Sequence, residues 1–226
     1  MQWIHDFDLF LFDFDGLLVN TEHLHYQAYV NVIEDMGHRL NLSFSNFIEL
    51  AHFNSKAWRE AIFKEIPELE PEWKTLYKKK KENYLSLVGA GKVDLMPGVK
   101  ELLSALDQAK IFRCVVTNSP LEQTQLLSSQ IPILKTIPKW IAREDYEKPK
   151  PNSECYLKAI ELYGKPGDRI IGFEDSIRGL HALLGTPALA VLICPKHHLL
   201  LEIALDKGGV HFESMASISK DQLVSK

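Results

Sequence analysis

The stretch Leu9-Phe10-Leu11-Phe12-Asp13-Phe14-Asp15-Gly16 joins an apolar run to two acids that stand two residues apart. A short apolar run followed by polar residues is typical of a buried strand. In an extended backbone Asp13 and Asp15 point the same way, and two like charges so close repel each other. The pair therefore indicates a cation or a function that compensates the repulsion, and Gly16 allows the chain to turn sharply afterwards.

Three later apolar runs resemble the first one. They are Phe112–Val116, Arg169–Phe173 and Ala188–Cys194, and a helical pattern follows every run except the last. Strands that alternate with helices favour a parallel sheet covered on both faces. We therefore predict an α/β fold with a Rossmann-like, doubly wound parallel sheet, in which ligands bind beyond the carboxyl ends of the strands.

A helical insertion follows the first predicted strand. Between about Thr21 and Lys92 the apolar residues recur at helical spacing in four separate stripes. We expect a small all-helical domain at residues 19–94, inserted into a core domain made of residues 1–18 and 95–226.

Polar residues also follow the later strands. Thr117 and Asn118 end the second run and suit an anion site at a helix N-terminus, with a plain helix cap as the alternative. Lys148 precedes a proline and could reach a phosphate, with an exposed loop lysine as the alternative. Glu174 and Asp175 end the third run, where both can reach a cation. Together these residues would place metal ligands, a hydroxyl and a cation around one edge of the sheet.

The composition argues against several classes of protein. Lys and Arg number 26 against 30 Asp and Glu, and the net charge of −4 leaves no basic excess for a nucleic-acid backbone. No run approaches the ~18 apolar residues of a membrane span, and no basic segment precedes the first apolar run as in a signal peptide. Cys114, Cys155 and Cys194 lack the spacing of a zinc or redox site. We expect a cytoplasmic protein with no nucleic-acid or membrane partner.

The order and spacing of four motifs resemble the haloacid dehalogenase superfamily. The sequence after the first motif, from Leu17 to Glu22, is similar to the subgroup with a helical cap, which includes phosphoglycolate phosphatases and β-phosphoglucomutase. The four motifs are Asp13-Phe14-Asp15-Gly16, Thr117-Asn118, Lys148-Pro149 and Glu174-Asp175.

The resemblance implies a role for each motif. Asp13 would attack phosphorus and form an aspartyl-phosphate, while Asp15 would protonate the leaving oxygen and then activate water. Mg²⁺ would lie between Asp13, the Asp15 backbone carbonyl and Asp175, with Glu174 as a ligand or close beside it. The residues implied to hold the transferring phosphate oxygens are Thr117, Asn118 and Lys148.

The resemblance also assigns the choice of substrate to the helical cap. Lys56 and His25 are the candidate substrate-binding residues, and His52 and Lys80 could also face the site. A solvated lysine and a packing histidine are the alternatives. β-Phosphoglucomutase has Gly and Arg where this chain has Phe53 and Lys56, and lysine does not bind phosphate bidentately as arginine does.

The leading hypothesis is a Mg²⁺-dependent phosphatase that hydrolyses a small phosphorylated metabolite, such as a sugar phosphate, and works as a monomer or weak dimer. The alternative is a phosphosugar mutase, which needs a phosphoenzyme at Asp13 that survives long enough to pass its phosphate on. A catalytically silent protein on this fold would be expected to lose Asp13, Asp15 or Lys148, and all three are present.

Overall fold

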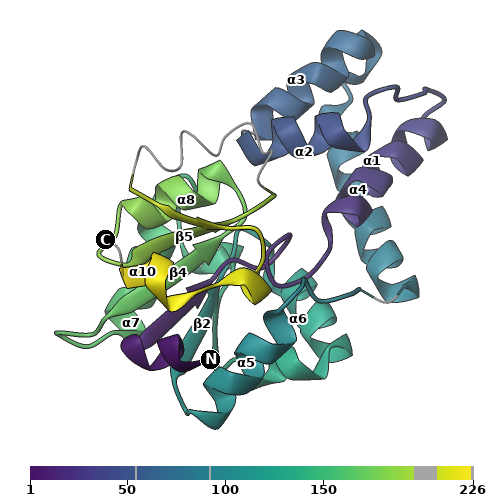
Figure 1. Cartoon of the computed structure of the whole chain (residues 1–226). Coiled ribbons are helices and arrows are strands. Elements are labelled where there is room, and N and C mark those ends of the chain that lie inside the picture. The colour runs from purple at the N-terminus through teal and green to yellow at the C-terminus, as the bar shows by residue number, and fades with distance from the viewer. Residues whose placement is uncertain (54, 92, 196–207, 225–226) are drawn as a thin grey trace. The chain divides into compact units, whose positions relative to one another are not determined.

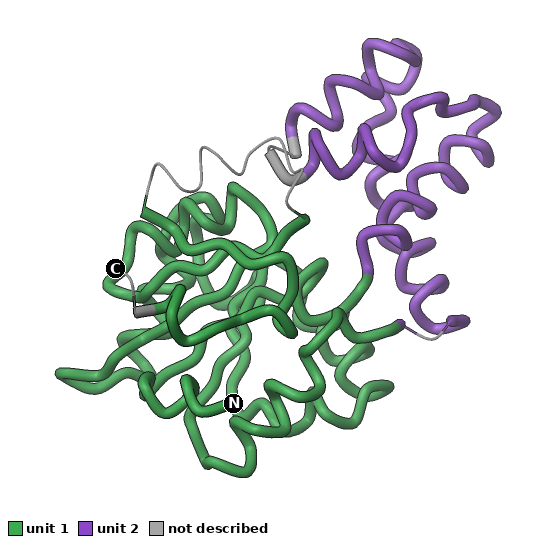
Figure 2. The backbone as a smooth tube through the Cα atoms, in the orientation of Figure 1, with its two compact units in different colours: residues 1–20, 94–226 green, residues 21–93 purple. Residues whose placement is uncertain are grey.

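The computed structural model describes residues 1–226 except 54, 92, 196–207 and 225–226, and the side chains of residues 52, 53, 55 and 224 also lie outside the description. The chain divides into two compact units, a core unit of residues 1–20 with 94–226 and a helical unit of residues 21–93 (Figure 2). The expected boundaries, after residues 18 and 94, lie within two residues of this division.

The core unit is built on a six-stranded parallel sheet in the order β3-β2-β1-β4-β5-β6. Strands β2, β4 and β5 of this sheet are labelled in Figure 1. Because β1 lies in the middle and the strand order reverses beside it, the sheet has the doubly wound topology of Rossmann-like folds. The predicted fold class is therefore confirmed. The strands are β1 (Leu9–Phe12), β2 (Phe112–Val116), β3 (Lys139–Ile141), β4 (Ile170–Glu174), β5 (Leu189–Ile193) and β6 (Val210–Phe212).

The two outer strands, β3 and β6, were not expected from the sequence. Each has only three residues, and each pairs with a neighbour on one side only. Strands of this length leave no apolar run for a pattern to detect. The four longer strands coincide with the predicted runs to within one residue at each end.

Strand β1 is buried on both faces because its side chains alternate between two apolar layers. Phe10 and Phe12 lie on one face and stack with Phe173, with the Phe12 and Phe173 ring centroids 5.3 Å apart. Leu9 and Leu11 point to the opposite face, into the cluster formed with helices α7 (Glu154–Tyr163) and α8 (Ile177–Leu184). Burying each such side chain contributes roughly 1.5–3 kcal/mol. Asp13 thus follows directly on a strand that is firmly held in place.

Helices cover both faces of the sheet. Helices α7 and α8 pack against one face of the sheet. Helices α5 and α6 each contact the short helix η3. Val99, Leu102, Leu103 and Leu106 recur at helical spacing and form the buried side of α5. The core helices are α5 (Val99–Gln108), α6 (Leu121–Gln130), α7 (Glu154–Tyr163), α8 (Ile177–Leu184) and α10 (Lys220–Val224), with 3₁₀ helices η1 (Gln2–Asp6), η3 (Pro132–Thr136), η4 (Arg143–Asp145) and η5 (Met215–Ser217).

The helical unit is held together by aromatic side chains. Trp58 is buried, and its ring meets those of Phe47 and Tyr29 edge-on at centroid distances of 5.1 and 5.7 Å. Such pairs add ~0.5–1.5 kcal/mol to the burial of the rings. The four apolar stripes predicted from the sequence correspond to its four helices. These are α1 (Glu22–Asp35), α2 (Phe44–Phe53), α3 (Ser55–Glu65) and α4 (Trp73–Ala90), with η2 (Pro67–Leu69) between α3 and α4.

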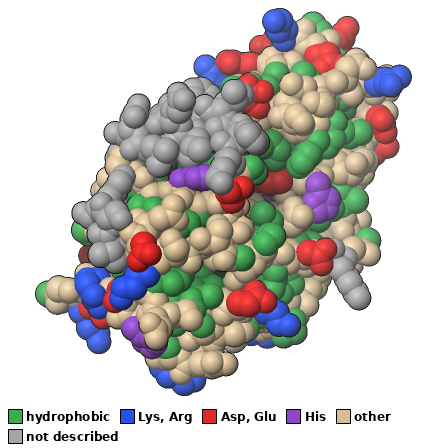
Figure 3. Space-filling model, in the orientation of Figure 1, with side chains coloured by type: hydrophobic (Ala, Val, Ile, Leu, Met, Phe, Trp, Pro, Cys, Tyr) green, Lys and Arg blue, Asp and Glu red, His purple; other side chains and the backbone are tan. Residues whose placement is uncertain are grey.

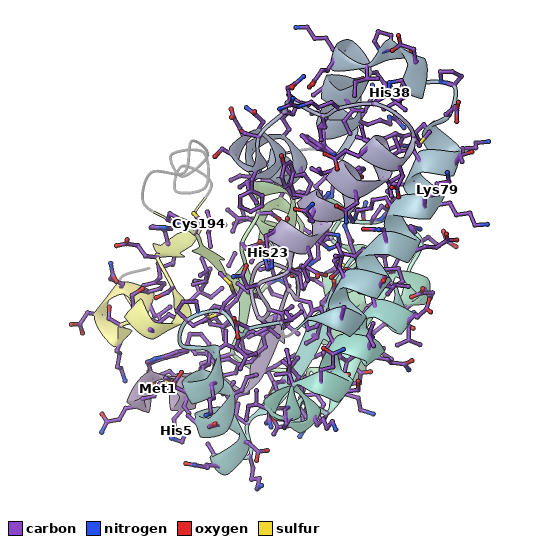
Figure 4. The ribbon with its side chains drawn as sticks, turned by 90° about the vertical axis from the view of Figure 1, so that its right-hand side faces the viewer. Met1, His5, His23, His38, Lys79 and Cys194 are labelled. Carbon is purple, nitrogen blue, oxygen red and sulfur yellow. The ribbon has the colours of Figure 1, made fainter. Side chains whose placement is uncertain are left out.

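The surface carries charges of both signs, interspersed on the face seen in Figure 3. In the basic run on α4, Lys78, Lys79 and Lys81 are exposed, and Figure 4 shows Lys79 extending outward from its helix. The fourth member of the run, Lys80, is buried. Of the helices in the described part of the chain, none combines the length and the apolar character that a membrane span needs.

Candidate active site

Asp13 stands at the carboxyl end of β1, where its backbone N–H donates to Phe173 O at 3.0 Å and continues the ladder between β1 and β4. Its side chain is buried, with Oδ1 only 2.6 Å from Lys150 Nζ. The residue predicted to be the nucleophile therefore lies in the middle of the sheet edge, against a buried cation.

The lysine at this position is Lys150, so the placement of Lys148 at the site was wrong. Lys148 is exposed, and its backbone N–H donates to Glu154 Oε2 at 3.1 Å, which holds this part of the loop on the surface. Lys150 lies two residues further on and is only 5% exposed. Both lysines precede a proline, so the local pattern alone could not distinguish them.

The Lys150 ammonium group is enclosed by oxygen atoms. Its Nζ lies 2.6 Å from Asp13 Oδ1 and from Glu174 Oε1. It also lies 2.7 Å from Val116 O and 2.9 Å from the Tyr156 hydroxyl, which itself donates to Glu174 Oε1 at 2.5 Å. An ammonium group has three protons, so four oxygen neighbours satisfy it completely. Tyr156 was not anticipated from the sequence, although it lies on α7, which begins just after the lysine.

The charges in this cluster shift one another's titration. Burial and the neighbouring Glu174 carboxylate raise the pKa of Asp13, and the attraction of Lys150 only partly opposes them. Burial by itself would lower the pKa of Lys150, but Asp13 and Glu174 raise it above its ordinary value, so this lysine stays charged. Burial, followed by the Glu174 charge, raises the pKa of the Tyr156 hydroxyl, which therefore keeps its proton.

Three acids of the cluster could hold a metal ion. Asp13, Glu174 and Asp175 each offer a carboxylate oxygen, and these oxygens lie within 4.8 Å of one another. Glu174 Oε2 is buried and finds no hydrogen-bond partner among the described residues. Three carboxylates this close repel one another, and hard oxygen donors are the ligands that Mg²⁺ prefers. The donor set thus fits a divalent cation.

Gly179 on α8 makes room for the Glu174 side chain. A Cβ atom at this position would come within 1.9 Å of Glu174 Oε2, which no real contact allows. The N–H of Gly179 donates to Oγ of Ser176 at 3.1 Å, and Ser176 thereby caps the start of α8. A residue without a side chain is therefore required where the helix passes the carboxylate.

The Asp15 side chain is bound by residues that follow β2. Gly16 follows with a positive φ of 77°, which gives the turn expected from the sequence. The Asp15 carboxylate accepts hydrogen bonds from Ser119 Oγ and from Gln123 Nε2. Neither contact was predicted, because Ser119 and Gln123 are 104 and 108 residues away from Asp15 along the chain.

The two residues after β2 support the site through their side chains. Thr117 is buried, and its Oγ1 accepts from the Ser119 N–H at 3.0 Å. Asn118 Oδ1 accepts from the Lys150 N–H at 3.2 Å and from the Tyr146 hydroxyl at 2.7 Å. Asn118 therefore connects the end of β2 to the lysine loop. Contact of these two residues with a phosphate stays a prediction.

The residues expected to bind substrate from the helical unit lie in two places. His25 Nδ1 is 2.7 Å from Lys80 Nζ, and the His25 ring stacks on Tyr84 with centroids 3.9 Å apart. Lys56 is exposed on α3 and pairs with Glu60 at 3.3 Å. The side chains of His52 and Phe53 fall outside the described residues. A substrate contact by any of these residues stays a prediction.

Comparisons with known proteins agree with this arrangement. A family model described as haloacid dehalogenase-like hydrolase matches residues 10–184. Protein CbbY of Cereibacter sphaeroides is 26% identical over 191 residues, which cover 82% of this chain and 83% of that protein. A phosphorylated carbohydrates phosphatase of Thermotoga maritima is 26% identical over 180 residues, which cover 76% of this chain and 78% of that protein.

A solved structure shares the fold. A mutant of CbbY from Rhodobacter sphaeroides, in complex with xylulose-(1,5)bisphosphate, superposes with a TM-score of 0.74. The identity is 22%, and the superposition covers 93% of this chain and 95% of that one. At this identity the likeness establishes the shared architecture, including the helical insertion after β1.

Proposed function

Because the chain belongs to the haloacid dehalogenase-like hydrolase family, we propose that it hydrolyses a small phosphorylated metabolite through an aspartyl-phosphate at Asp13. The observation that carries this proposal is the Asp13 carboxylate, held 2.6 Å from the buried Lys150 ammonium at the end of β1. A carboxylate with an adjacent fixed cation suits attack on a phosphate ester, because phosphoryl transfer depends on positioning and on neutralisation of charge.

In the first step, a carboxylate oxygen of Asp13 forms a bond to phosphorus as the ester P–O bond breaks. The electron pair of that bond stays on the leaving oxygen, which takes a proton from the Asp15 carboxyl group. The products are the free alcohol and the aspartyl-phosphate. Lys150 would bind a phosphoryl oxygen or keep the Asp13 carboxylate oriented for attack.

In the second step, the Asp15 carboxylate removes a proton from water, and the water oxygen forms a bond to phosphorus. The bond between Asp13 and phosphorus breaks, which regenerates the Asp13 carboxylate and releases inorganic phosphate. Asp15 thus ends the cycle protonated, as it began. The separate positions of the two aspartates support this division of roles, because Asp13 contacts Lys150 whereas Asp15 contacts Ser119 and Gln123.

A divalent cation, Mg²⁺ by preference, would be held by Asp13, Asp175 and the Asp15 backbone carbonyl, with Glu174 as a ligand or nearby. When bound, it supplies positive charge that neutralises the transferring phosphoryl oxygens. The same charge would offset the burial and the Glu174 repulsion that raise the pKa of Asp13, and so would favour the ionised nucleophile.

The class of substrate is inferred from the relatives. One is called a phosphorylated carbohydrates phosphatase, and the structure of another contains xylulose-(1,5)bisphosphate. We therefore expect a phosphorylated sugar or a metabolite of similar size. Selection among such esters is assigned to the helical unit, residues 21–93, because the motif residues of the core act on the phosphoryl group that all of these esters share.

The test is release of phosphate from a panel of sugar phosphates by the purified chain with Mg²⁺. Asp13→Asn keeps the shape of the side chain but removes its charge, so we expect turnover to fall by ~10⁴-fold or more. Asp94→Asn makes the same change at an exposed position of the core unit and should leave turnover unchanged. An acid-quenched reaction should contain a phosphoenzyme in the wild type and none in Asp13→Asn. Turnover by Asp13→Asn at the wild-type rate would disprove the mechanism.

A further inference from the structure

Gln123 is a buried amide at a position where glutamine is usually exposed. It lies in the first turn of α6, is only 7% exposed, and its Nε2 is 3.1 and 3.2 Å from the two carboxylate oxygens of Asp15. Glutamine is seldom buried unless its amide is fully used. Its neighbour Gln125, on the same helix, is exposed.

The usual role of a glutamine at this point of a helix is not open to Gln123. Three residues after the N-cap, a glutamine side chain ordinarily accepts the backbone N–H of the cap residue. The N-cap of α6 is Pro120, which has no N–H to donate. Helix capping therefore does not explain why Gln123 turns inward.

Ser119 completes the contact with Asp15. Its Oγ donates to Asp15 Oδ2 and accepts from Gln123 Nε2 at 3.0 Å. The backbone of Ser119 is itself anchored, since its N–H donates to Thr117 Oγ1 and its carbonyl accepts from the Arg143 N–H, both at 3.0 Å. The donors around Asp15 thus sit on a fixed support.

These contacts restrict the orientation of the carboxylate. The terminal torsion of an aspartate is broad, so an unrestrained carboxylate rotates freely. The Gln123 amide spans both oxygens, and the Ser119 hydroxyl binds one of them, which selects one plane for the group. Proton transfer to a leaving oxygen requires that orientation, because a misplaced catalytic group can cost ~10²-fold in rate.

We propose that Gln123, together with Ser119, is a positioning residue that orients Asp15 for proton transfer. This inference rests on the proposed function, in which Asp15 is the general acid and base. It predicts that loss of the Gln123 amide reproduces the defect of losing Asp15 in a weaker form. The defect should grow as the leaving group becomes poorer, because a poor leaving oxygen needs its proton more.

The test compares phenyl phosphate, which has a poor leaving group, with para-nitrophenyl phosphate, which has a good one. Gln123→Met keeps the length and helix preference of the side chain but removes the donor. We expect kcat/KM to fall on the order of 10–10²-fold for phenyl phosphate, and several-fold less for para-nitrophenyl phosphate. Gln125→Met is the matched control on the exposed face of α6 and should change neither rate.

A double variant separates orientation from a general structural effect. In an Asp15→Asn background the carboxylate is already lost, so Gln123→Met should cause little further loss on phenyl phosphate. Ser119→Ala should show the same selective defect more weakly, and Ser119→Thr, which keeps the hydroxyl, should recover part of it. This second pair keeps the test open if Gln123→Met folds poorly.

If the wild type is active, two results would overturn this inference and leave the proposed function standing. One is an equal loss on both substrates in Gln123→Met and Ser119→Ala. The other is a full additional loss in the Asp15→Asn background. If the wild type releases phosphate from none of these substrates, neither the two aryl esters nor the sugar phosphates, the proposed function is overturned and this inference with it.

Discussion

The two units of this chain differ in the charged side chains that they bury, although both also bury aromatic rings. The core unit encloses Asp13, Lys150 and Glu174 at the end of its central strands, in contact with one another. The helical unit encloses rings such as Trp58 and Phe47. Each unit also contains a buried lysine, but the two lysines have different surroundings. Lys150 is bound by carboxylates. Lys80 lies over the rings of Tyr29 and Tyr84, beside His25.

This difference indicates where the chemistry of the molecule lies. Burying acids and a lysine costs desolvation energy, and a buried ion pair is weak support for a fold. Groups that cost stability are retained where they have a function. Aromatic packing, in contrast, stabilises without requiring any reaction. We therefore expect small polar changes in the core unit to affect catalysis, and matched changes in the helical unit to affect stability or substrate choice.

Removal of divalent cations should have the largest effect. Exhaustive dialysis against EDTA should abolish phosphate release, and Mg²⁺ should restore it, because the cation held by these acids would neutralise the charge of the transferring phosphoryl oxygens. Mg²⁺ should also raise the melting temperature, since a ligand that binds the native state stabilises it, by ~2.7 kcal/mol at 100 times its Kd.

Calorimetry with and without Mg²⁺ measures this second effect without any substrate. Asp175→Asn should remove most of the shift, whereas the exposed Asp94→Asn should keep it. Undiminished activity after EDTA, or an equal Mg²⁺ shift in both variants, would contradict a metal site in this cluster.

Substitution of Lys150 should have the next largest effect, and the same substitution at Lys148 should have almost none. Lys150→Met leaves Asp13 and Glu174 buried without their partner, which typically costs ~3–5 kcal/mol of folding free energy. It should also lower kcat/KM for para-nitrophenyl phosphate on the order of 10²–10³-fold, as for other lost phosphoryl or oxyanion contacts. Lys148→Met is the matched control and should stay within ~0.5 kcal/mol of the wild type.

Urea denaturation and initial rates measure both lysine variants. Lys150→Met with normal stability and activity, or a larger loss in Lys148→Met, would remove Lys150 from the centre of the site.

Much of the fold was predictable because its longer elements carry clear patterns. Apolar runs located the four longer strands, and spacing located the helices of residues 21–93. The edge strands escaped detection because Lys139–Ile141 and Val210–Phe212 have only three residues each, one of them polar. Such an edge strand is stabilised by pairing with its neighbour, and its own residues carry no pattern that predicts this pairing.

The site was predictable only where chain order implied proximity. Residues that follow parallel strands meet at one sheet edge, which is why Asp13, Glu174 and Asp175 were found together. The choice between Lys148 and Lys150 depended on which side chain the loop turns inward, and no local pattern records that. The contact of Gln123 with Asp15 joins residues far apart in sequence and needed the structure.

Two glycines within helices give a more moderate contrast between the units. Gly179→Ala would place a Cβ within 1.9 Å of the Glu174 carboxylate, so α8 or the carboxylate must move. We expect a loss of ~1–3 kcal/mol, as for overpacked cores, together with reduced activity. A Cβ at Gly89 on α4 would meet no described residue within 4 Å, so Gly89→Ala should gain up to ~1 kcal/mol from helix propensity.

Thermal unfolding and phosphate release measure both glycine variants. Equal changes in stability at the two positions would show that the Glu174 carboxylate does not depend on the gap left by Gly179.

Lys56 should produce the smallest effect, and the most selective one. It is exposed on α3, and its ion pair with Glu60 is of the helical i,i+4 kind, worth ~0.3–0.5 kcal/mol, so Lys56→Ala should leave stability almost unchanged. If the helical unit selects the substrate, the variant should lower kcat/KM for the preferred sugar phosphate on the order of 10-fold, the effect of one charged contact. It should barely change kcat/KM for para-nitrophenyl phosphate, which offers the core unit its phosphoryl group but lacks a sugar.

Lys64→Ala, at another exposed lysine of α3, is the matched control. Equal losses on both esters would assign Lys56 to general phosphate binding, and no loss on either would leave the helical unit's choice of substrate to residues other than this lysine.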